Sequence, residues 1–375
     1  MRVSPVLDGL RTYPFVRLTD AKRELAARGV DVIDFGVGEP REETPAFIRE
    51  ALAAAIEPLS TYPLAEGLPE LREAVAAWCS RRFGVGLDPV TQVIPTLGAK
   101  EAVFHLAQVV AGDLVVVTTP GYPVAARGAA FAGKGVLELP LHAERGFLPD
   151  LAAVPAETWE RVAVLWLNYP NNPTAATAPL ELYEQAAALA RRFDFVLASD
   201  EAYSELWFGD RAPVSALQVG DLRNVAVLNT LSKRSSMPGY RSGFVAGDAA
   251  VIAALKRYRP NVGVAPQEFV QRAASAAWTD EDHVVAVRER YRAKREALLP
   301  ALEAAGLRHA GGDATFFLWL EAPAGIAERL LERGIVVAPG DFFGEAGAGY
   351  VRLALVPTPE DCRRAADVIR AALVA

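Results

Sequence analysis

The stretch from residue 230 to residue 243, TLSKRSSMPGYRSG, contains a lysine, a serine and an arginine at a spacing that could do chemistry. A lysine amine that has lost its charge is a nucleophile toward an aldehyde, with which it forms an imine. A serine hydroxyl and an arginine guanidinium can together bind a phosphate. Ser232 precedes Lys233 directly, and Arg241 follows in the same stretch. The stretch could therefore hold a phosphate and bring an amine to the molecule that carries it, although Lys233 alone would equally fit a solvated loop.

Lys233 lies where a strand is expected to end. The apolar run at residues 224–228 (NVAVL) is short and β-branched, which is typical of a buried strand, and a second run follows at 244–246. In an α/β sheet, ligands bind beyond the carboxyl ends of the strands. We therefore interpret Lys233 as a candidate for a binding site at this edge.

Short apolar runs and helical patterns alternate from about residue 93 to about residue 255. The expected strands are 93–95, 114–118, 136–140, 162–167, 195–198, 224–228 and 244–246, with helices at 102–110 and 179–192. This alternation predicts an α/β fold with a mostly parallel mixed sheet flanked by helices. Three successive strand ends carry polar groups, namely Asn172, then Asp200 with Tyr203, then Lys233 with Arg241. We expect these side chains to meet at one rim.

The remaining chain predicts a smaller α+β unit. Helices are expected at 18–29, 45–56, 68–83, 281–304, 324–333 and 359–373, with strands at 315–320, 335–339 and 350–356. We predict an N-terminal arm and part of the small domain at 1–44, a large domain at 45–270, and a C-terminal small domain at 271–375.

Composition excludes several classes of function. The chain of 375 residues has a net charge of -7 and no basic tract, which argues against a nucleic-acid partner. Its two cysteines, Cys79 and Cys362, have neither disulfide-framework nor metal-site spacing, which fits a reducing cytoplasm and no metal. No run approaches the roughly 18 apolar residues of a membrane span, and the N-terminus lacks the apolar core of a leader. We expect a cytoplasmic protein that acts on small molecules.

The rim residues match the demands of pyridoxal 5'-phosphate (PLP) catalysis. That chemistry needs a lysine for the aldehyde, a carboxylate for the pyridine nitrogen and a cation for the phosphate. Lys233, Asp200 and Arg241 meet these demands, although Asp200 alone could be a helix N-cap. Tyr203 and Asn172 could both donate hydrogen bonds to the phenolic oxygen, which lowers the pKa of the imine. For Asn172 alone, a plain turn is the alternative.

These motifs resemble those of class I/II aminotransferases of PLP fold type I. The motifs are TLSK at 230–233, PGYRSG at 238–243, NYPNNPT at 168–174 and SDEAY at 199–203. The resemblance extends from about residue 32 to residue 355 and implies a role for each matching position. It implies that Lys233 forms the Schiff base, that Asp200 pairs with the pyridine nitrogen, and that Asn172 and Tyr203 bind the phenolic oxygen. The phosphate would be bound by Ser232, by Arg241 and by a backbone turn at Ala99 and Lys100. Tyr122 would stack on the ring face. A core tyrosine is the alternative for Tyr122.

The resemblance also implies substrate and partner contacts. Arg352 matches the arginine that pairs with the substrate's α-carboxylate, and Gly38 adds a backbone contact to the same carboxylate. Alternation supports this because Val351 and Leu353 point away from Arg352, although a rim salt bridge is the alternative. Asn172 is expected to contact the substrate as well. Tyr62 matches a tyrosine that reaches the neighbouring subunit's phosphate, which implies a homodimer.

The chain departs from the family pattern after the asparagine motif. Ala175 and Ala176 follow Thr174, where family members usually carry glycine. Because glycine there concerns backbone shape and not chemistry, this departure puts the local turn in doubt rather than the activity.

The resemblance implies amino-group transfer between amino acids and 2-oxo acids. Residues 232–248, 262–274 and 283–296 resemble N-succinyldiaminopimelate aminotransferases of lysine biosynthesis more than aspartate or aromatic enzymes. The implied reaction moves an amino group from glutamate to N-succinyl-2-amino-6-ketopimelate. Lys100, Arg17 and Arg234 are the candidates to bind the distal carboxylate.

Two alternatives stay open. Another PLP enzyme on this scaffold would be an aminotransferase for aspartate, alanine or aromatic substrates, or a carbon–sulfur lyase, because residues that bind the ring do not fix the reaction. A regulator that senses PLP is the alternative from another class, and it would need a DNA-binding segment that we do not find.

Overall fold

A seven-stranded sheet forms the centre of the computed structural model, which describes residues 1–9 and 14–374. Its strands, in spatial order, are β2 (Val93–Thr96), β8 (Gly243–Gly247), β7 (Val225–Thr230), β6 (Val196–Asp200), β5 (Val162–Asn168), β3 (Leu114–Thr119) and β4 (Gly135–Pro140). β8 is antiparallel to both of its neighbours, and the other pairs are parallel. The predicted mostly parallel mixed sheet is confirmed.

Helices cover both faces of this sheet because its strands are apolar on both sides. Along β5, Val164 and Trp166 face one apolar cluster, whereas Leu165 and Leu167 face another. A strand buried on both faces reads as a continuous apolar run, as the sequence does here. The first cluster lies under α5 (Gly98–Val109), α6 (Val124–Phe131) and α10 (Ala249–Tyr258), and the second lies under α8 (Leu180–Phe193), α4 (Pro69–Phe83) and α11 (Glu268–Thr279).

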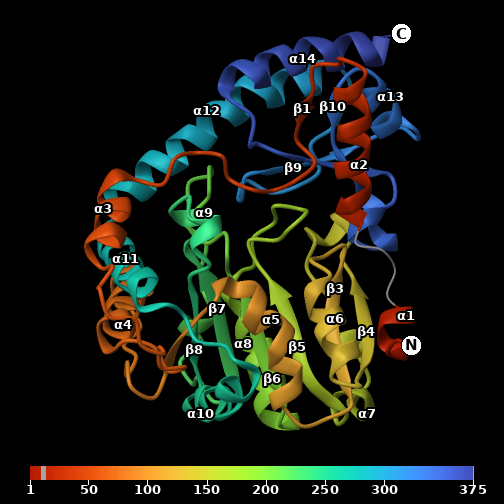
Figure 1. The fold of residues 1–375 in the computed structure, drawn as a ribbon. Coiled ribbons are helices and arrows are strands. Elements are labelled where there is room, and N and C mark those ends of the chain that lie inside the picture. The colour runs from red at the N-terminus through yellow and green to blue at the C-terminus, as the bar shows by residue number, and fades with distance from the viewer. Residues whose placement is uncertain (10–13, 375) are drawn as a thin grey trace.

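A second, smaller unit faces the carboxyl ends of the parallel strands (Figure 1). It has β9 (Phe317–Glu321), β11 (Ala338–Pro339), β12 (Tyr350–Ala354), α12 (Asp282–Ala304), α13 (Ile326–Glu332) and α14 (Pro359–Val374). The N-terminal β1 (Ile33–Asp34) pairs with β10 (Ile335–Val336), so the start of the chain joins this unit. The division at residues 44 and 270 stays a prediction.

The remaining helices are short or peripheral. They are α1 (Pro5–Gly9), α2 (Pro14–Ala27), α3 (Ala46–Ala54), α7 (Ala156–Trp159) and α9 (Leu231–Arg234). The sequence did not lead us to predict α6, α10 and α11. The buried face of α6 consists of alanine, valine and glycine and therefore contrasts weakly with its surroundings.

No helix within residues 1–9 and 14–374 is long and apolar enough to cross a membrane. The parallel strands all end at the same edge, where α9 caps β7 in Figure 1. This edge therefore brings together side chains that are distant in sequence.

Candidate active site

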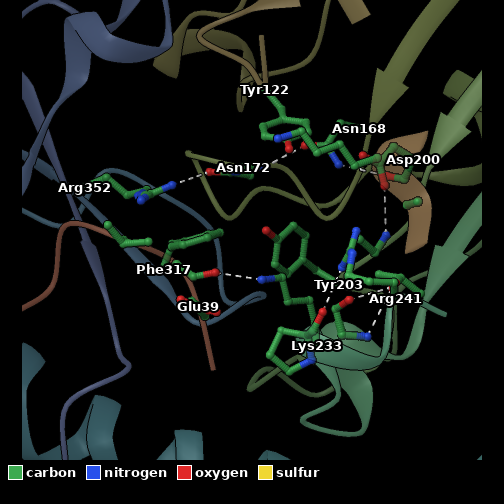
Figure 2. A pocket seen from close by; sticks show the side chains of 18 residues that line it. Glu39, Tyr122, Asn168, Asn172, Asp200, Tyr203, Lys233, Arg241, Phe317 and Arg352 are labelled. Atoms are coloured by element: carbon green, nitrogen blue, oxygen red, sulfur yellow. Dashed lines mark hydrogen bonds between the residues drawn. The ribbon is translucent and has the colours of Figure 1, made fainter. Parts of the chain in front are cut away.

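A cavity of about 360 Å³ lies between the strand ends of the large sheet and the smaller unit. Among its lining residues are almost all of the predicted site residues, namely Gly38, Ala99, Lys100, Tyr122, Asn172, Asp200, Tyr203, Ser232, Lys233, Arg241 and Arg352. Figure 2 shows the labelled side chains converging on this space from both units. The fold therefore assembles the residues that the sequence placed on one rim.

Lys233 reaches the cavity from α9, the one-turn helix after β7. The helix begins with a cap, because the Thr230 hydroxyl accepts a hydrogen bond from the Ser232 N–H. The Lys233 Nζ atom donates to the Gly38 carbonyl at 2.7 Å. Burial and the nearby Arg352 lower the pKa of Lys233 to about 8, against the opposing effect of Glu39. An amine with such a pKa is partly neutral near physiological pH.

Asp200 ends β6 beside Asn168, the last residue of β5. Burial raises the pKa of Asp200 to about 6, and the Ala202 N–H and the Lys233 charge oppose that rise. The Asn168 side-chain amide donates to the Asp200 carbonyl at 2.9 Å. A cationic partner at the buried carboxylate would favour its ionised form.

Arg352 comes from the middle of β12 and lies almost completely buried. Its guanidinium donates to the Asn172 Oδ1 atom at 2.9 Å and to the Gly36 carbonyl at 2.6 Å, and it lies 4.3 Å from the Phe317 ring centroid. The contact with Asn172 is visible in Figure 2. As alternation along the strand predicts, Val351 and Leu353 lie in the apolar cluster on the other side.

Arg241 and the first turn of α5 form a cationic corner of the cavity. The Arg241 guanidinium donates to the carbonyls of Pro238 at 2.9 Å and Leu97 at 3.2 Å. Gly98, with φ at +67°, makes room for it, because a Cβ there would lie 2.6 Å from the Arg241 Nη2 atom. The first N–H groups of a helix lack partners within the helix and favour an anion. With the Ser232 hydroxyl, this corner suits a phosphate.

Lys100 and Tyr62 occupy different surroundings. Lys100 lies exposed at the edge of the cavity, where partial burial and the charges of Arg241 and Arg127 lower its pKa. Tyr62 is fully exposed and is not among the residues that line the cavity.

The prediction that Arg234 could bind the distal carboxylate is wrong. Arg234, a candidate for the distal carboxylate, is 1% exposed and donates to the Ala277 carbonyl and to the Glu281 carboxylate, each at 2.7 Å. Its guanidinium lies 4.8 Å from the Trp278 ring centroid. A helix turns about 100° per residue, so Arg234 points away from the cavity that Lys233 enters. The side chain of Arg17, the other candidate, lies outside the described part of the chain.

Glu39, Asn168 and Phe317 are among the lining residues that the sequence did not lead us to predict. Asn168 carried a signal, because it ends an apolar strand in the same way as Asp200. Its Oδ1 accepts the Asn172 N–H at 2.9 Å, so it fixes that loop. For Glu39 and Phe317, the sequence held no comparable signal.

Gly38 and Ala175 show why local backbone shape matters here. A Cβ at Gly38 would lie 2.7 Å from the Phe317 ring, so only glycine fits this approach. Ala175 adopts φ of +59°, the left-handed region that favours glycine. The Asn171 side chain holds this turn by accepting from the Thr174 N–H and hydroxyl.

The chain is similar to known proteins along nearly its whole length. The sequence model of the family "Aminotransferase class I and II" matches residues 30–369. An LL-diaminopimelate aminotransferase of Nitratidesulfovibrio vulgaris (strain DP4) is 41% identical over 371 residues, which cover 95% of this chain and 96% of the relative. A probable N-succinyldiaminopimelate aminotransferase from Thermus thermophilus has a TM-score of 0.88 at 34% identity, and covers 96% of this chain and 99% of its own. The Thermus thermophilus aspartate aminotransferase with maleate has a TM-score of 0.90 at 33% identity, with 100% of both chains covered.

Proposed function

The chain belongs to the class I and II aminotransferase family, whose members depend on PLP, and we propose that it transfers an amino group between LL-diaminopimelate and a 2-oxo acid in lysine biosynthesis. N-succinyl-LL-diaminopimelate is the second candidate. Glutamate and 2-oxoglutarate are the proposed partner pair.

The donor set of the cavity fits PLP. Arg241, Ser232 and the first turn of α5 would hold the phosphate, and Gly98 leaves the space that this arrangement needs. Asp200, whose pKa is raised to about 6 by burial, would pair with the pyridine nitrogen. Asn172 and Tyr203 would bind the phenolic oxygen, and Tyr122 would cover a ring face. The bound cofactor supplies an electron sink for the carbanion at the substrate Cα.

Lys233 is proposed as the acid and base of the reaction. A pKa near 8 lets its Nζ atom take a proton as the free amine and give one as the ammonium. The Nζ atom would accept the proton from the substrate Cα and donate it to the cofactor carbon that holds the transferred nitrogen. In this structure, the hydrogen bond to the Gly38 carbonyl holds this atom at the cavity wall.

Arg352 is proposed to orient the amino acid by its α-carboxylate. A guanidinium binds a carboxylate through two parallel hydrogen bonds, which fix direction as well as position. Its contacts with Phe317 and the Gly36 carbonyl hold the guanidinium before substrate binds. This orientation would present the substrate Cα to Lys233.

The charged residues that line the cavity are the reason for proposing LL-diaminopimelate as the substrate. This seven-carbon molecule has an ammonium and a carboxylate at its far end, whereas the succinylated form has carboxylates and an amide there. Glu39 and Lys100 line the same cavity and carry opposite charges. They complement a far end with both charges, and Glu39 would repel one with only negative charges. The 41% identical relative supports the same choice.

The second candidate rests on different observations. The Thermus thermophilus structure of a probable N-succinyldiaminopimelate aminotransferase superposes well. The sequence of residues 232–248 also resembles that of N-succinyldiaminopimelate aminotransferases. Lys100 and the neighbouring Arg127 would then bind the succinyl carboxylate.

Initial rates distinguish the two substrates. With 2-oxoglutarate as acceptor, we expect kcat/KM for LL-diaminopimelate to exceed that for the succinylated form by about tenfold or more, equivalent to ~1.4 kcal/mol. Glu39→Gln should reduce this ratio and leave the KM for glutamate, which lacks a distal ammonium, nearly unchanged. A preference for the succinylated substrate would replace the first candidate by the second, and no turnover of either would refute both.

We also propose a homodimer in which Tyr62 reaches the neighbouring site. The segment around Tyr62 exposes Ile56, Leu59 and Leu64, each more than 60%, which is unusual for large apolar side chains of a monomer. Sedimentation of the purified protein tests the dimer. Mixing inactive Lys233→Ala and Tyr62→Ala chains should restore turnover, because a mixed dimer has one intact site. No restoration in a proven mixed dimer would contradict a shared site.

The cytoplasm is the proposed compartment. Cys79 and Cys362 are both buried free thiols, as in proteins of reducing compartments. Recovery of the native protein from the periplasm or the medium of intact cells would contradict this proposal.

A further inference from the structure

Ser235, His283 and Asp280 form a hydrogen-bonded chain directly behind the Lys233 turn. The His283 Nε2 atom lies 2.8 Å from the Ser235 Oγ atom, and its Nδ1 atom lies 2.6 Å from an Asp280 carboxylate oxygen. Asp280 also accepts the His283 N–H at 3.0 Å. These are the residue types of a nucleophilic triad, but Ser235 is 0% exposed. Substrate cannot reach its hydroxyl, so the chain has a different role.

The hydrogen-bond partners determine the proton positions. The Asp280 carboxylate is an acceptor, so Nδ1 carries the proton, and the Nε2 of a neutral ring accepts from the Ser235 hydroxyl. Burial lowers the pKa of His283, the hydrogen bond to Asp280 opposes this, and the nearby Arg234 charge lowers it further. The neutral ring with Ser235 as donor is therefore the form near pH 7.

The turn that follows Lys233 needs such support. α9 is a single helical turn, which is too short to be stable alone. Ser236 adopts φ of +51°, a left-handed conformation that costs a serine free energy. Hydrogen bonds to other elements hold the turn. Arg234 donates to the Ala277 carbonyl near the end of α11, and the His283 Nε2 atom bonds the Ser235 hydroxyl. The Thr44 hydroxyl donates to the Ser236 carbonyl at 2.6 Å.

We propose that His283 is a positioning residue, whose Nε2 atom holds Ser235 and thereby keeps the Lys233 amine at the Gly38 carbonyl. Asp280 fixes the ring in the required tautomer. Because His283 lies in the first turn of α12, the same contact links the start of this long helix to the lysine turn. The inference goes beyond the choice of substrate, and it rests on Lys233 as the reactive lysine.

Two variants separate the ring nitrogens. In His283→Gln the side-chain amide can reach the Nε2 position and accept from Ser235, whereas His283→Asn can replace only the Nδ1 contact with Asp280. Acetylation of Lys233 in the apo-protein, followed across pH by peptide mass spectrometry, reports the pKa of the amine without cofactor or substrate. Steady-state kinetics of the PLP-loaded enzyme give the second readout.

We expect the acetylation midpoint near pH 8 in the wild type and in His283→Gln. In His283→Asn, the displaced amine regains water, and its midpoint should rise by about 0.7 pH unit, the equivalent of one ordinary hydrogen bond. The kcat should fall about tenfold with little change in KM, since Arg352 is untouched. Equal midpoints in wild type and His283→Asn would refute the proposal.

Ser235→Ala and Ser215→Ala complete the test. Ser235→Ala removes the same contact and should raise the midpoint to the same extent, which decides the question if His283→Asn does not fold. Ser215 is equally buried but caps a turn elsewhere, so Ser215→Ala should lower stability without moving the midpoint. A shift in both serine variants would indicate general loosening and contradict the proposal. Failure of the wild type to attach PLP at Lys233 would instead refute the proposed role of that lysine.

Discussion

Replacing Lys233 by methionine should stabilise the apo-protein at neutral pH. In the folded protein, burial and Arg352 lower the pKa of this amine from 10.5 to about 8. A difference of this size corresponds to about 3 kcal/mol of unfavourable burial of the charge at pH 7. Methionine has a similar shape and no charge, but it loses the hydrogen bond to the Gly38 carbonyl, about 1 kcal/mol. The net expectation for Lys233→Met is a gain of about 2 kcal/mol at pH 7.

The sign of the pH dependence follows from the direction of the shift. Between pH 8 and pH 10.5, the unfolded wild type binds more protons at this lysine than the folded protein, so its stability rises with pH. Above that window, the cost of burying the charge is gone, and only the lost hydrogen bond separates the two proteins. Lys233→Met should therefore be more stable at pH 7 and slightly less stable at pH 10.5.

Urea unfolding of both apo-proteins at half-unit steps of pH measures this difference. All other titrating groups are common to the two proteins, so the difference in unfolding free energy isolates Lys233. A difference that stays constant between pH 7 and pH 10.5 would show that the amine is not perturbed, and would refute the reasoning on its role as a base.

Three further changes test the site and its turns. Ala175→Val should destabilise the protein by about 2 kcal/mol or more, because a β-branched residue is strained at positive φ, while Ala175→Gly should change stability by less than about 0.5 kcal/mol, since relief of strain offsets lost burial and added chain entropy; equal effects in chemical unfolding would contradict this. Gly98→Ala should displace Arg241 and raise the dissociation constant for PLP about tenfold, ~1.4 kcal/mol; an unchanged constant in an equilibrium titration would exclude the proposed phosphate corner. Arg352→Lys should raise the KM for amino acids about 10-fold to 100-fold because lysine cannot replace the two parallel bonds, with PLP occupancy unchanged; an unchanged KM would remove Arg352 from substrate binding.

The ends of the strands were predictable because two features of the sequence indicate them: a short apolar run and the polar residue that follows it. Short apolar runs indicate buried strands, and parallel strands share one edge. The polar residue after each run, such as Asp200 or Lys233, could therefore be assigned to the cavity from the sequence alone. Asn168 could have been found by the same rule, since it ends its own run.

Residues on irregular segments could not be found in this way. Glu39 follows a strand of only two residues, and Phe317 starts a strand of the smaller unit. Their position depends on how the two units meet, which no periodicity encodes. Arg234 was misassigned because the sequence does not show that the single helical turn directs its side chain against Trp78 and Trp278.

Helix boundaries showed the same limitation. The sequence predicted a helix from residue 102, but α5 already begins at Gly98, so the expected phosphate turn is the first turn of the helix itself. A glycine in a sequence usually indicates a loop, so Gly98 was not expected to begin a helix. In the structure, Gly98 has a positive φ and Arg241 occupies the space that a side chain at this position would take.

The most direct test of the proposed function is an absorbance titration of the purified PLP-loaded protein with LL-diaminopimelate. We expect the visible band of the Lys233-bound cofactor to disappear in proportion to the keto acid formed, and 2-oxoglutarate to restore it. Reduction with borohydride beforehand should attach the cofactor to the peptide that contains Lys233. An unchanged spectrum with LL-diaminopimelate would contradict the proposed substrate, and attachment at another lysine would contradict the proposed role of Lys233.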